Sequence, residues 1–515
     1  MGIEIEDKFD VPQDYVIPDL SGLADVVGPK SYQLVALYYD TPDLRLAARG
    51  VTLRRRRGGN DAGWHLKLPK AKGVRQEITH PLTRSTKIVP PELAELVRAY
   101  TRGADLQVVA ELDTRRSVTV LHDGGTMLVE IADDRVKGTI YAREPAEDKP
   151  ANTEPAEDGA AGDEDAGVKV VRWREVEAEL LDDTRQALLA KVGKRLRKAG
   201  ATPSDATSKL AKLLEPAPPA RARTVPGSAG ETVVDYLASQ VSALLSQDPR
   251  VRRAEDDAVH QMRVACRRLR SALKAFKSVV VDTGQLQEEL QWLGNVLGEA
   301  RDLEVTRARF AKLLARVAPE LIIGPVHTRL GSDLLKREEE SYVRIKDALS
   351  GERYYALLNA LDELIAEPNL GKAAAKPAQE RLSAIAADGW NRVTRAYDFA
   401  QAIEDPERRE IAMHDVRKAA KRARYTAEAL QPTLGRNMAK LAKLSEDIQE
   451  VLGTHQDGVV AQETLAKEAE SARQAGEDTF TYGLLVGIER NIADRAHADF
   501  PRVWAETVKA VGMLL

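Results

Sequence analysis

The chain has 515 residues, 43% hydrophobic and 30% charged, with a formal net charge of -4, so about two to four domains with buried cores are expected. It has no run of about 18 apolar residues, and its start, MGIEIEDKFD, lacks the basic-then-apolar order of a signal peptide. The single cysteine, Cys266, excludes intrachain disulfides and cysteine metal clusters. We therefore expect a globular cytoplasmic protein without a membrane-spanning helix.

The first 215 residues are predicted to be mainly β-strands. Segments such as VTLRRRR, WHLKLP and VRWREVEAEL are β-rich or alternate between apolar and polar residues. HDGGTM predicts a tight hairpin turn, and a helix is expected near 184–199. Residues 144–167 carry many acids, prolines and glycines and almost no apolar side chains, which predicts a disordered insert between two strands.

Charged residues alternate along several of these strands, and every second side chain of a strand shares a face. The acidic rows are Glu4 and Glu6, followed by Lys8, and Glu175, Glu177 and Glu179. The other pairings are Arg54 with Arg56, His65 with Lys67, Arg75 with Glu77, Glu111 with Asp113 and Arg115, and Glu130 with Asp134. If the strands close into a barrel, carboxylates and cations share its interior, which suits Mg²⁺ or Mn²⁺ and phosphate oxygens. The alternative is the wet face of a half-buried sheet.

A linker rich in Pro, Gly and Ala is expected at 216–230, and helical periodicity runs from 231 to 515. Within it, HQMRVACRRLR at 260–270 places an apolar arc and a cationic arc on one helix. The cationic arc consists of His260, Arg263, Arg267, Arg270 and Lys274. No acid lies between Val259 and Val281, whereas an ordinary solvated helix face mixes both signs of charge.

The helical region contains an internal repeat. HQMRVACRRLR returns as HDVRKAAKRAR at an offset of 154 residues, and VLGEARDLEV at 296 returns as VLGTHQDGVV at 451. The second cationic arc consists of His414, Arg417, Lys421 and Arg424. We expect two helical bundles whose packing brings the two arcs together. Zinc is not expected at His260 or His414, because neither has a carboxylate at i+4.

Ordered motifs give the chain a resemblance to two known families. EIEDK at 4–8, YYDTPD at 38–43, then LRRR, LKLP, TRRS, EVEAEL and SKL at 208–210 resemble the CYTH domain, or triphosphate tunnel metalloenzyme family. This resemblance covers about residues 1–215. The two His-x-x-Arg helices and the two Leu-Gly…Asp segments resemble the CHAD domain, the conserved histidine α-helical domain, over about 229–515.

The CYTH resemblance implies an eight-stranded antiparallel tunnel that binds triphosphate-containing substrates with Mg²⁺ or Mn²⁺. Many such proteins hydrolyse inorganic triphosphate, some act on thiamine triphosphate or RNA 5′ ends, and a few cyclise ATP. By motif matching, the metal ligands would be Glu4, Glu6, Glu177 and Glu179, with Glu175 as an open alternative, and the catalytic residues Glu4, Glu6, Lys8 and Glu177. The phosphate ligands would be Lys8, Arg54, Arg56, Lys67, Arg75, Arg115 and Lys209.

The CHAD resemblance implies inorganic polyphosphate binding by the residues of the two cationic arcs. We therefore expect an α+β protein with a tunnel domain at 1–215, a linker at 216–230 and an all-α domain of two repeated helical bundles at 231–515. Its expected function is metal-dependent hydrolysis of inorganic triphosphate or a related triphosphate, coupled to polyphosphate binding in the cytoplasm, at polyphosphate granules.

Three alternatives remain at this point. In the first, the tunnel is not catalytic and the whole chain is a polyphosphate scaffold or sensor. In the second, the tunnel is an adenylate cyclase. In the third, the chain binds nucleic acid. The acid pairs of the first and last strands argue against the first alternative. Aromatic residues are only 5% of the chain and do not interleave with the basic arcs, so base stacking has little support and nucleic acid is not the expected partner.

Overall fold

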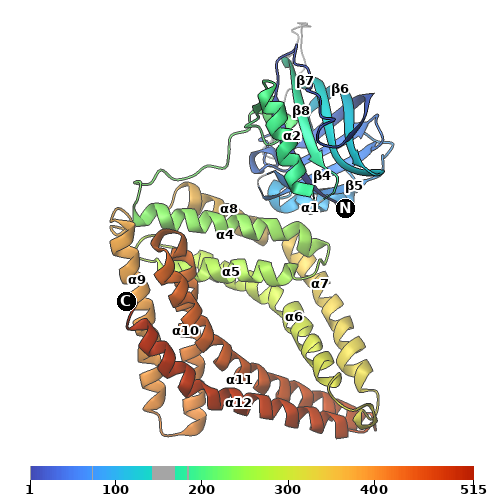
Figure 1. Ribbon diagram of the computed structural model, residues 1–515. Helices are drawn as coiled ribbons and strands as arrows, with labels where there is room; N and C mark the ends of the chain where they lie inside the picture. Colours follow the sequence, from blue (N-terminus) through green and yellow to red (C-terminus); the bar gives the residue numbers. More distant parts are fainter. Residues whose placement is uncertain (1, 72, 142–168, 183–184, 515) are drawn as a thin grey trace, which may run out of the picture. The chain divides into compact units, whose positions relative to one another are not determined.

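The computed structural model describes residues 2–71, 73–141, 169–182 and 185–514 (Figure 1). The chain divides into two compact units, Met1–Pro219 and Ala220–Leu515. The predicted insert, 144–167, lies outside the described residues. The predicted linker, 216–230, spans the division between the units, and the first helix of the second unit begins inside it at Ala229.

The N-terminal unit is an antiparallel barrel of eight strands, as predicted. In sheet order the strands run β5-β4-β3-β2-β6-β7-β8-β1, and β1 pairs back with β5 to close the barrel. A two-residue strand, β9 (Thr202–Pro203), adds to β1. The eight strands are β1 (Gly2–Asp10), β2 (Asp25–Asp40), β3 (Thr52–Arg57), β4 (Gly63–Ala71), β5 (Val74–His80), β6 (Gln107–Asp123), β7 (Thr126–Ile140) and β8 (Lys169–Leu180).

The turn between β6 and β7 is the predicted two-residue hairpin. Gly124 and Gly125 both have positive φ, 54° and 94°, which residues other than glycine rarely adopt. The turn fixes the register of the longest hairpin of the barrel, in which Arg116 faces Asp134.

The outer face of the barrel is covered on one side by helix α2 (Gln186–Lys198), which crosses β8 in Figure 1. Alternate residues of β8 point outward, and Val176 and Ala178 form a buried core with Val192 and Leu196 of α2. The intervening residues of β8 therefore point into the barrel. A further helix of this unit is α1 (Pro91–Thr101).

The short helix α3 (Lys209–Leu214) packs against the inward face of the barrel. Its N-terminus is capped by the hydroxyl of Ser208, which accepts a hydrogen bond from the Ala211 amide at 3.0 Å. Leu210 and Leu213 join an apolar cluster with Ala36, Leu112 and Val136. Because these neighbours are inward-facing strand residues, α3 fills one end of the barrel interior. Gly138 makes room for it, since a Cβ there would lie 2.7 Å from Leu213.

The C-terminal unit is helical, and most consecutive helices pack side by side. Its helices are α4 (Ala229–Arg252), α5 (Ala258–Ala275), α6 (Gly284–Leu314), α7 (Leu334–Leu349), α8 (Glu352–Ala366), α9 (Ala378–Gln401), α10 (Pro406–Leu434), α11 (Arg436–Gln474) and α12 (Phe480–Val511). The repeated sequences fall on α5 with α6 and on α10 with α11, which confirms the two-repeat prediction. None of the helices among the described residues is apolar over a length that would cross a membrane.

The apolar arc of α5 lies in the core as predicted, with Met262, Cys266, Leu269, Leu273 and Phe276 all buried. Burial raises the pKa of the Cys266 thiol to about 12, so this thiol stays protonated and unreactive. The cationic arc on the opposite side of α5 is thereby held toward α10, against which α5 packs directly.

Candidate functional site

Most of the charged rows of the strands point into the barrel, where they line one cavity of about 530 Å³. All but one of the residues predicted for the tunnel line it. They are Glu4, Glu6, Lys8, Arg54, Arg56, Lys67, Arg75, Glu177, Glu179 and Lys209. The interior is therefore ionic rather than apolar, and acids and bases from distant parts of the chain meet there.

The exception is Arg115. It is exposed on the outside of β6, and its neighbour Arg116 lines the cavity instead. The prediction chose the wrong face of this strand. Arg115 shares its face with Glu111 and Asp113, and this row resembles the acidic rows of β1 and β8. It belongs to the solvent-facing side, and the inward row contains the buried Leu112 and Thr114.

At one side of the cavity, three carboxylates surround the ammonium group of Lys209, a residue of the cavity lining. Lys209 Nζ lies 2.7 Å from Glu175, 2.6 Å from Glu177 and 3.0 Å from Asp134. Burial alone would lower the pKa of Lys209, but the carboxylates raise it well above its usual value. Oxygen atoms of Asp134, Glu175 and Glu177 all lie within 4.8 Å of one another, which is spacing that would also suit a metal ion.

Arg116 completes this group. Its guanidinium donates to both carboxylate oxygens of Asp134, at 2.8 and 2.7 Å, and to Glu177 at 2.9 Å. Lys8 also pairs with Glu177. Burial opposes ionisation of Glu177, yet Lys209, Lys8 and Arg116 hold its pKa well below the usual value. Arg116 and Asp134 were not among the predicted site residues, although Asp134 belongs to a row that the sequence analysis noted.

A second group lies on β1, β4 and β5. Lys67 Nζ donates to both oxygens of Glu4, at 2.7 and 2.6 Å, and lies 3.6 Å from Glu77. His65 Nδ1 is 2.8 Å from Glu77, and burial lowers the pKa of this histidine. Lys67 therefore bridges two carboxylates in the same way that Lys209 bridges three.

Glu179 differs from these carboxylates. It faces Glu6 on β1 and Glu130 on β7 across the sheet, and within the described residues it has no hydrogen-bond or ion-pair partner. Burial, and then the negative charge of Glu4, raise the pKa of Glu179 to about 7. A divalent cation near Glu179 would relieve this repulsion and supply the missing partner. Of the four predicted metal ligands, Glu4, Glu6, Glu177 and Glu179, only Glu177 belongs to a group of three acidic side chains, among the described residues, whose oxygen atoms lie within 4.8 Å of one another.

Cations gather on β3 and its neighbours. Burial, followed by repulsion from Arg54 and Arg116, lowers the pKa of Arg56 to about 9. Arg56 pairs with Asp61, and Arg54 Nη1 donates to the hydroxyl of Tyr38 at 3.4 Å. The buried Nε atoms of Arg54 and Arg56 have no acceptor among the described residues. Unsatisfied buried donors on crowded guanidinium groups fit the oxygen atoms of an anion.

The helical unit contains the second predicted site, where the cationic arcs of α5 and α10 meet. Burial, then repulsion from Arg267, Arg417 and Arg263, lowers the pKa of Lys421 to about 8. Within the described residues neither Arg267 nor Lys421 forms an ion pair, and the buried Nε of Arg267 has no acceptor. The packing thus concentrates positive charge from both repeats on one surface.

The same contact recurs in both repeats. Arg263 of α5 lies 3.5 Å from the Cβ position of Gly298 on α6 and pairs with Asp302 at 2.8 Å. Arg417 of α10 lies 3.4 Å from the Cβ position of Gly453 on α11 and is 3.9 Å from Asp457. The repeated Leu-Gly…Asp segments therefore seat and orient the two arginines. The acids come from neighbouring helices, and a search for counter-charges along α5 alone misses them.

The remaining arc residues are distributed along the two helices. Burial lowers the pKa of both His260 and His414, so both rings are neutral at pH 7. Arg270 donates to Gln291 at 2.8 Å, and repulsion from Arg422 followed by burial lowers the pKa of Lys274. Arg424 is paired with Glu428 and Glu446, at 2.7 and 2.8 Å, and is the most fully neutralised member of the arcs.

Comparisons with known proteins match this division. Residues 2–213 match the CYTH domain and residues 235–466 match the CHAD domain. Two Mycobacterium tuberculosis proteins, Uncharacterized protein MT2285 (strain CDC 1551 / Oshkosh) and Uncharacterized protein Rv2226 (strain ATCC 25618 / H37Rv), are each 38% identical to this chain over 525 residues, which cover 99% of it and 97% of theirs. The crystal structure of the CHAD domain from the plant Ricinus communis superposes with a TM-score of 0.45 and 25% identity, over 56% of this chain and 95% of that one.

The CYTH family comprises triphosphatases and cyclases, depends on metal ions and binds triphosphate substrates. The order of the two matches along the chain is the order expected from the motifs. With its full-length relatives and its two matched domains, the chain belongs to the family of proteins in which a CYTH domain is followed by a CHAD domain.

Proposed function

We propose that the barrel hydrolyses inorganic triphosphate, or a related triphosphate, with Mg²⁺ or Mn²⁺, and that the helical unit binds inorganic polyphosphate. In this proposal residues 1–215 form the catalytic domain and residues 231–515 the binding domain of a cytoplasmic protein that associates with polyphosphate granules. The observation that carries it is the cavity lining, in which buried carboxylates and unsatisfied guanidinium groups face the same space.

The side chains divide the work between them. Arg54, Arg56 and Arg75 present donors to phosphate oxygens and disperse the charge that builds up on the transferred phosphoryl group. Lys67 and Lys209 are held in place by carboxylates, so they are oriented before the substrate arrives. A metal ion held by Glu4, Glu6, Glu177 and Glu179 would neutralise phosphate charge and help to activate a water molecule.

The test is a turnover assay of the purified chain with triphosphate, pyrophosphate, ATP and long-chain polyphosphate, with Mg²⁺ and with Mn²⁺. We expect orthophosphate release from triphosphate, and its loss in the Glu4→Gln/Glu6→Gln variant. Both substitutions keep side-chain volume, and circular dichroism would confirm that the variant is folded. Full activity in the folded variant contradicts the proposal. Cyclic AMP from ATP supports the cyclase alternative, and no turnover with tight triphosphate binding supports a sensor.

The cationic surface of α5 and α10 supports the second part of the proposal. A polyanion without bases needs concentrated charge and no stacking partners, and the residues of this surface are Arg, Lys and His. Titration of the full chain with long-chain polyphosphate and with single- and double-stranded DNA of matched charge tests the assignment. Equal or tighter binding to DNA would show that the surface recognises nucleic acid instead.

A further inference from the structure

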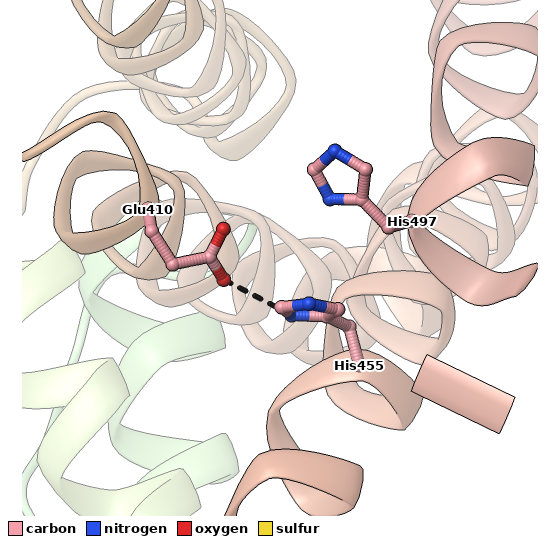
Figure 2. A group of neighbouring side chains, drawn as sticks. All are labelled: Glu410, His455 and His497. Atoms are coloured by element: carbon pink, nitrogen blue, oxygen red, sulfur yellow. Dashed lines mark ion pairs between the residues drawn. The ribbon is translucent and has the colours of Figure 1, made fainter. Parts of the chain in front are cut away.

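Outside both proposed sites, three side chains from three helices of the C-terminal unit converge. Figure 2 shows Glu410 of α10, His455 of α11 and His497 of α12. One ligand atom from each lies within 4.8 Å of the others. Glu410 Oε1 is 3.0 Å from His455 Nδ1, and the two imidazole ring centres are 5.4 Å apart.

We propose that these residues bind a late first-row transition-metal ion, for which Zn²⁺ is the first probe. Two imidazole nitrogens and one carboxylate oxygen are a donor set that Zn²⁺ accepts, with a water molecule in the fourth position. Tetrahedral bonds of about 2.0–2.1 Å place the donor atoms roughly 3.4 Å apart. The donor atoms already lie within 4.8 Å of one another, so binding would require only that side-chain rotation bring them to this spacing.

The surroundings leave the position free for a metal ion. In the tunnel, Lys209 occupies the space between the carboxylates Asp134, Glu175 and Glu177. Glu410, by contrast, has no lysine or arginine ion-pair partner among the described residues, and His455 is its partner instead. His497 is exposed and His455 and Glu410 are partly exposed, so an ion has access from solvent.

The internal repeat shows that this group belongs to the second half alone. At the repeat offset of 155, the residue of the first half that corresponds to His455 is the buried Ala300. Polyphosphate binding by the repeated arcs therefore does not explain His455. A bound ion would join α10, α11 and α12, and the inference is independent of the proposed function.

The test uses the metal-free full chain, titrated calorimetrically with Zn²⁺. We expect His455→Ala and His497→Ala to bind one fewer Zn²⁺ per chain than the parent protein, whatever the tunnel binds. His327→Ala is the matched control, an exposed histidine of the same unit outside the group, and should keep the full stoichiometry. Zn²⁺ should also raise Tm less in the two variants than in the parent, because it binds the folded state.

A spectroscopic measurement identifies the ligands. Co²⁺ in a four-coordinate site with nitrogen ligands has strong visible absorption, which octahedral oxygen sites lack. We expect this absorption in the parent protein and in His327→Ala, and its loss in His497→Ala. His497 is exposed, so this variant should fold. Equal Zn²⁺ stoichiometry in the parent and His497→Ala, or identical Co²⁺ spectra, would overturn the proposal.

Discussion

The tunnel and the helical surface contain the same cationic residue types in opposite electrostatic settings. In the tunnel, carboxylates surround Lys209 and raise its pKa despite burial. On the helical surface, burial and arginine neighbours lower the pKa of Lys421 to about 8. Around Lys209 the tunnel neutralises its cation and orders it in advance, whereas around Lys421 the helical surface retains positive charge that an external anion would neutralise. Preorganisation suits chemistry on a short substrate, and uncompensated charge suits binding of a long one.

Among substitutions that test this difference between the tunnel and the helical surface, Arg116→Ala should have the largest effect, on both turnover and stability. Arg116→Ala removes a guanidinium that holds Asp134 and Glu177. Triphosphate turnover should fall by about 10²- to 10³-fold, because a preorganised donor is lost. Loss of one partner from a buried ion-pair network should also lower the free energy of unfolding by about 3 kcal/mol. Steady-state assays and urea unfolding measure the two effects.

The neighbouring residue provides the control for this experiment. Arg115→Ala, on the outer face of the same strand, should leave turnover close to that of the parent and change the free energy of unfolding by less than about 0.5 kcal/mol. If Arg115→Ala were the damaging variant and Arg116→Ala the silent one, the strand would present its other face to the cavity.

The helical surface should respond to charge removal through affinity rather than turnover. Changing Arg263, Arg267, Arg417 and Lys421 together to Ala should remove most of the polyphosphate affinity. The slope of log K against the logarithm of salt concentration receives about 0.7 from each phosphate contact of a single-stranded polyanion. Removal of four cations should therefore make this slope shallower by about 3. Titrations at several salt concentrations measure this slope, and an unchanged slope would show that polyphosphate binds elsewhere. Triphosphate turnover by the tunnel is the internal control.

Lys421 predicts a pH dependence for the same binding. Because its pKa is lowered to about 8, the free protein loses this charge as pH rises through 8, so affinity should fall as pH rises above about 7. The affinity should fall by about tenfold by pH 9.5, because loss of one hydrogen bond from a charged donor weakens binding by about this factor. His260 and His414 do not contribute, because lowered pKa values keep them neutral over this range. Lys421→Arg should flatten the profile, and an unaltered profile would assign the titration to another group.

The smallest expected effect on polyphosphate affinity comes from Gly298, the glycine against which Arg263 packs. Gly298→Leu would place a bulky side chain where the guanidinium lies, 3.5 Å from the Cβ position, and should weaken polyphosphate binding a few-fold by displacing Arg263. Gly294→Leu, on the same helix, has no atom within 4 Å of its Cβ position and should bind like the parent. Equal affinities of the two variants would show that the glycine seat does not orient the arginine.

Much of this structure could be predicted from the sequence, because charged and apolar residues recur in it at the periods of strands and helices. Alternation on β1 and β8 is strict, so the strand period alone predicted that Glu4 shares a face with Glu6 and that Glu177 shares one with Glu179. That these faces point into the barrel was an expectation from the resemblance, and the structure places all four residues on the cavity lining. The repeat likewise predicted that the cationic arcs of α5 and α10 belong to equivalent helices. Both inferences needed only local pattern and its recurrence.

What the sequence did not predict depends on contacts between distant elements. On β6 both rows carry charge, and only the closure of the barrel decides between Arg115 and Arg116. Nothing local links Glu410, His455 and His497, which come from three helices, or Arg424 to Glu446 of the next helix. Pairing across helices also neutralises part of the basic arcs, which a helical wheel cannot show.

Helix α3 has a consequence for the topology of substrates. Because Leu210 and Leu213 fill one end of the barrel interior, a chain cannot pass through on that side. A linear polyanion longer than the cavity must therefore enter with one terminus leading and leave in reverse. A cyclic phosphate such as trimetaphosphate has no terminus to insert. If the barrel hydrolyses triphosphates as proposed, α3 would restrict it to the free ends of linear phosphate chains, whatever the length of the chain outside the cavity.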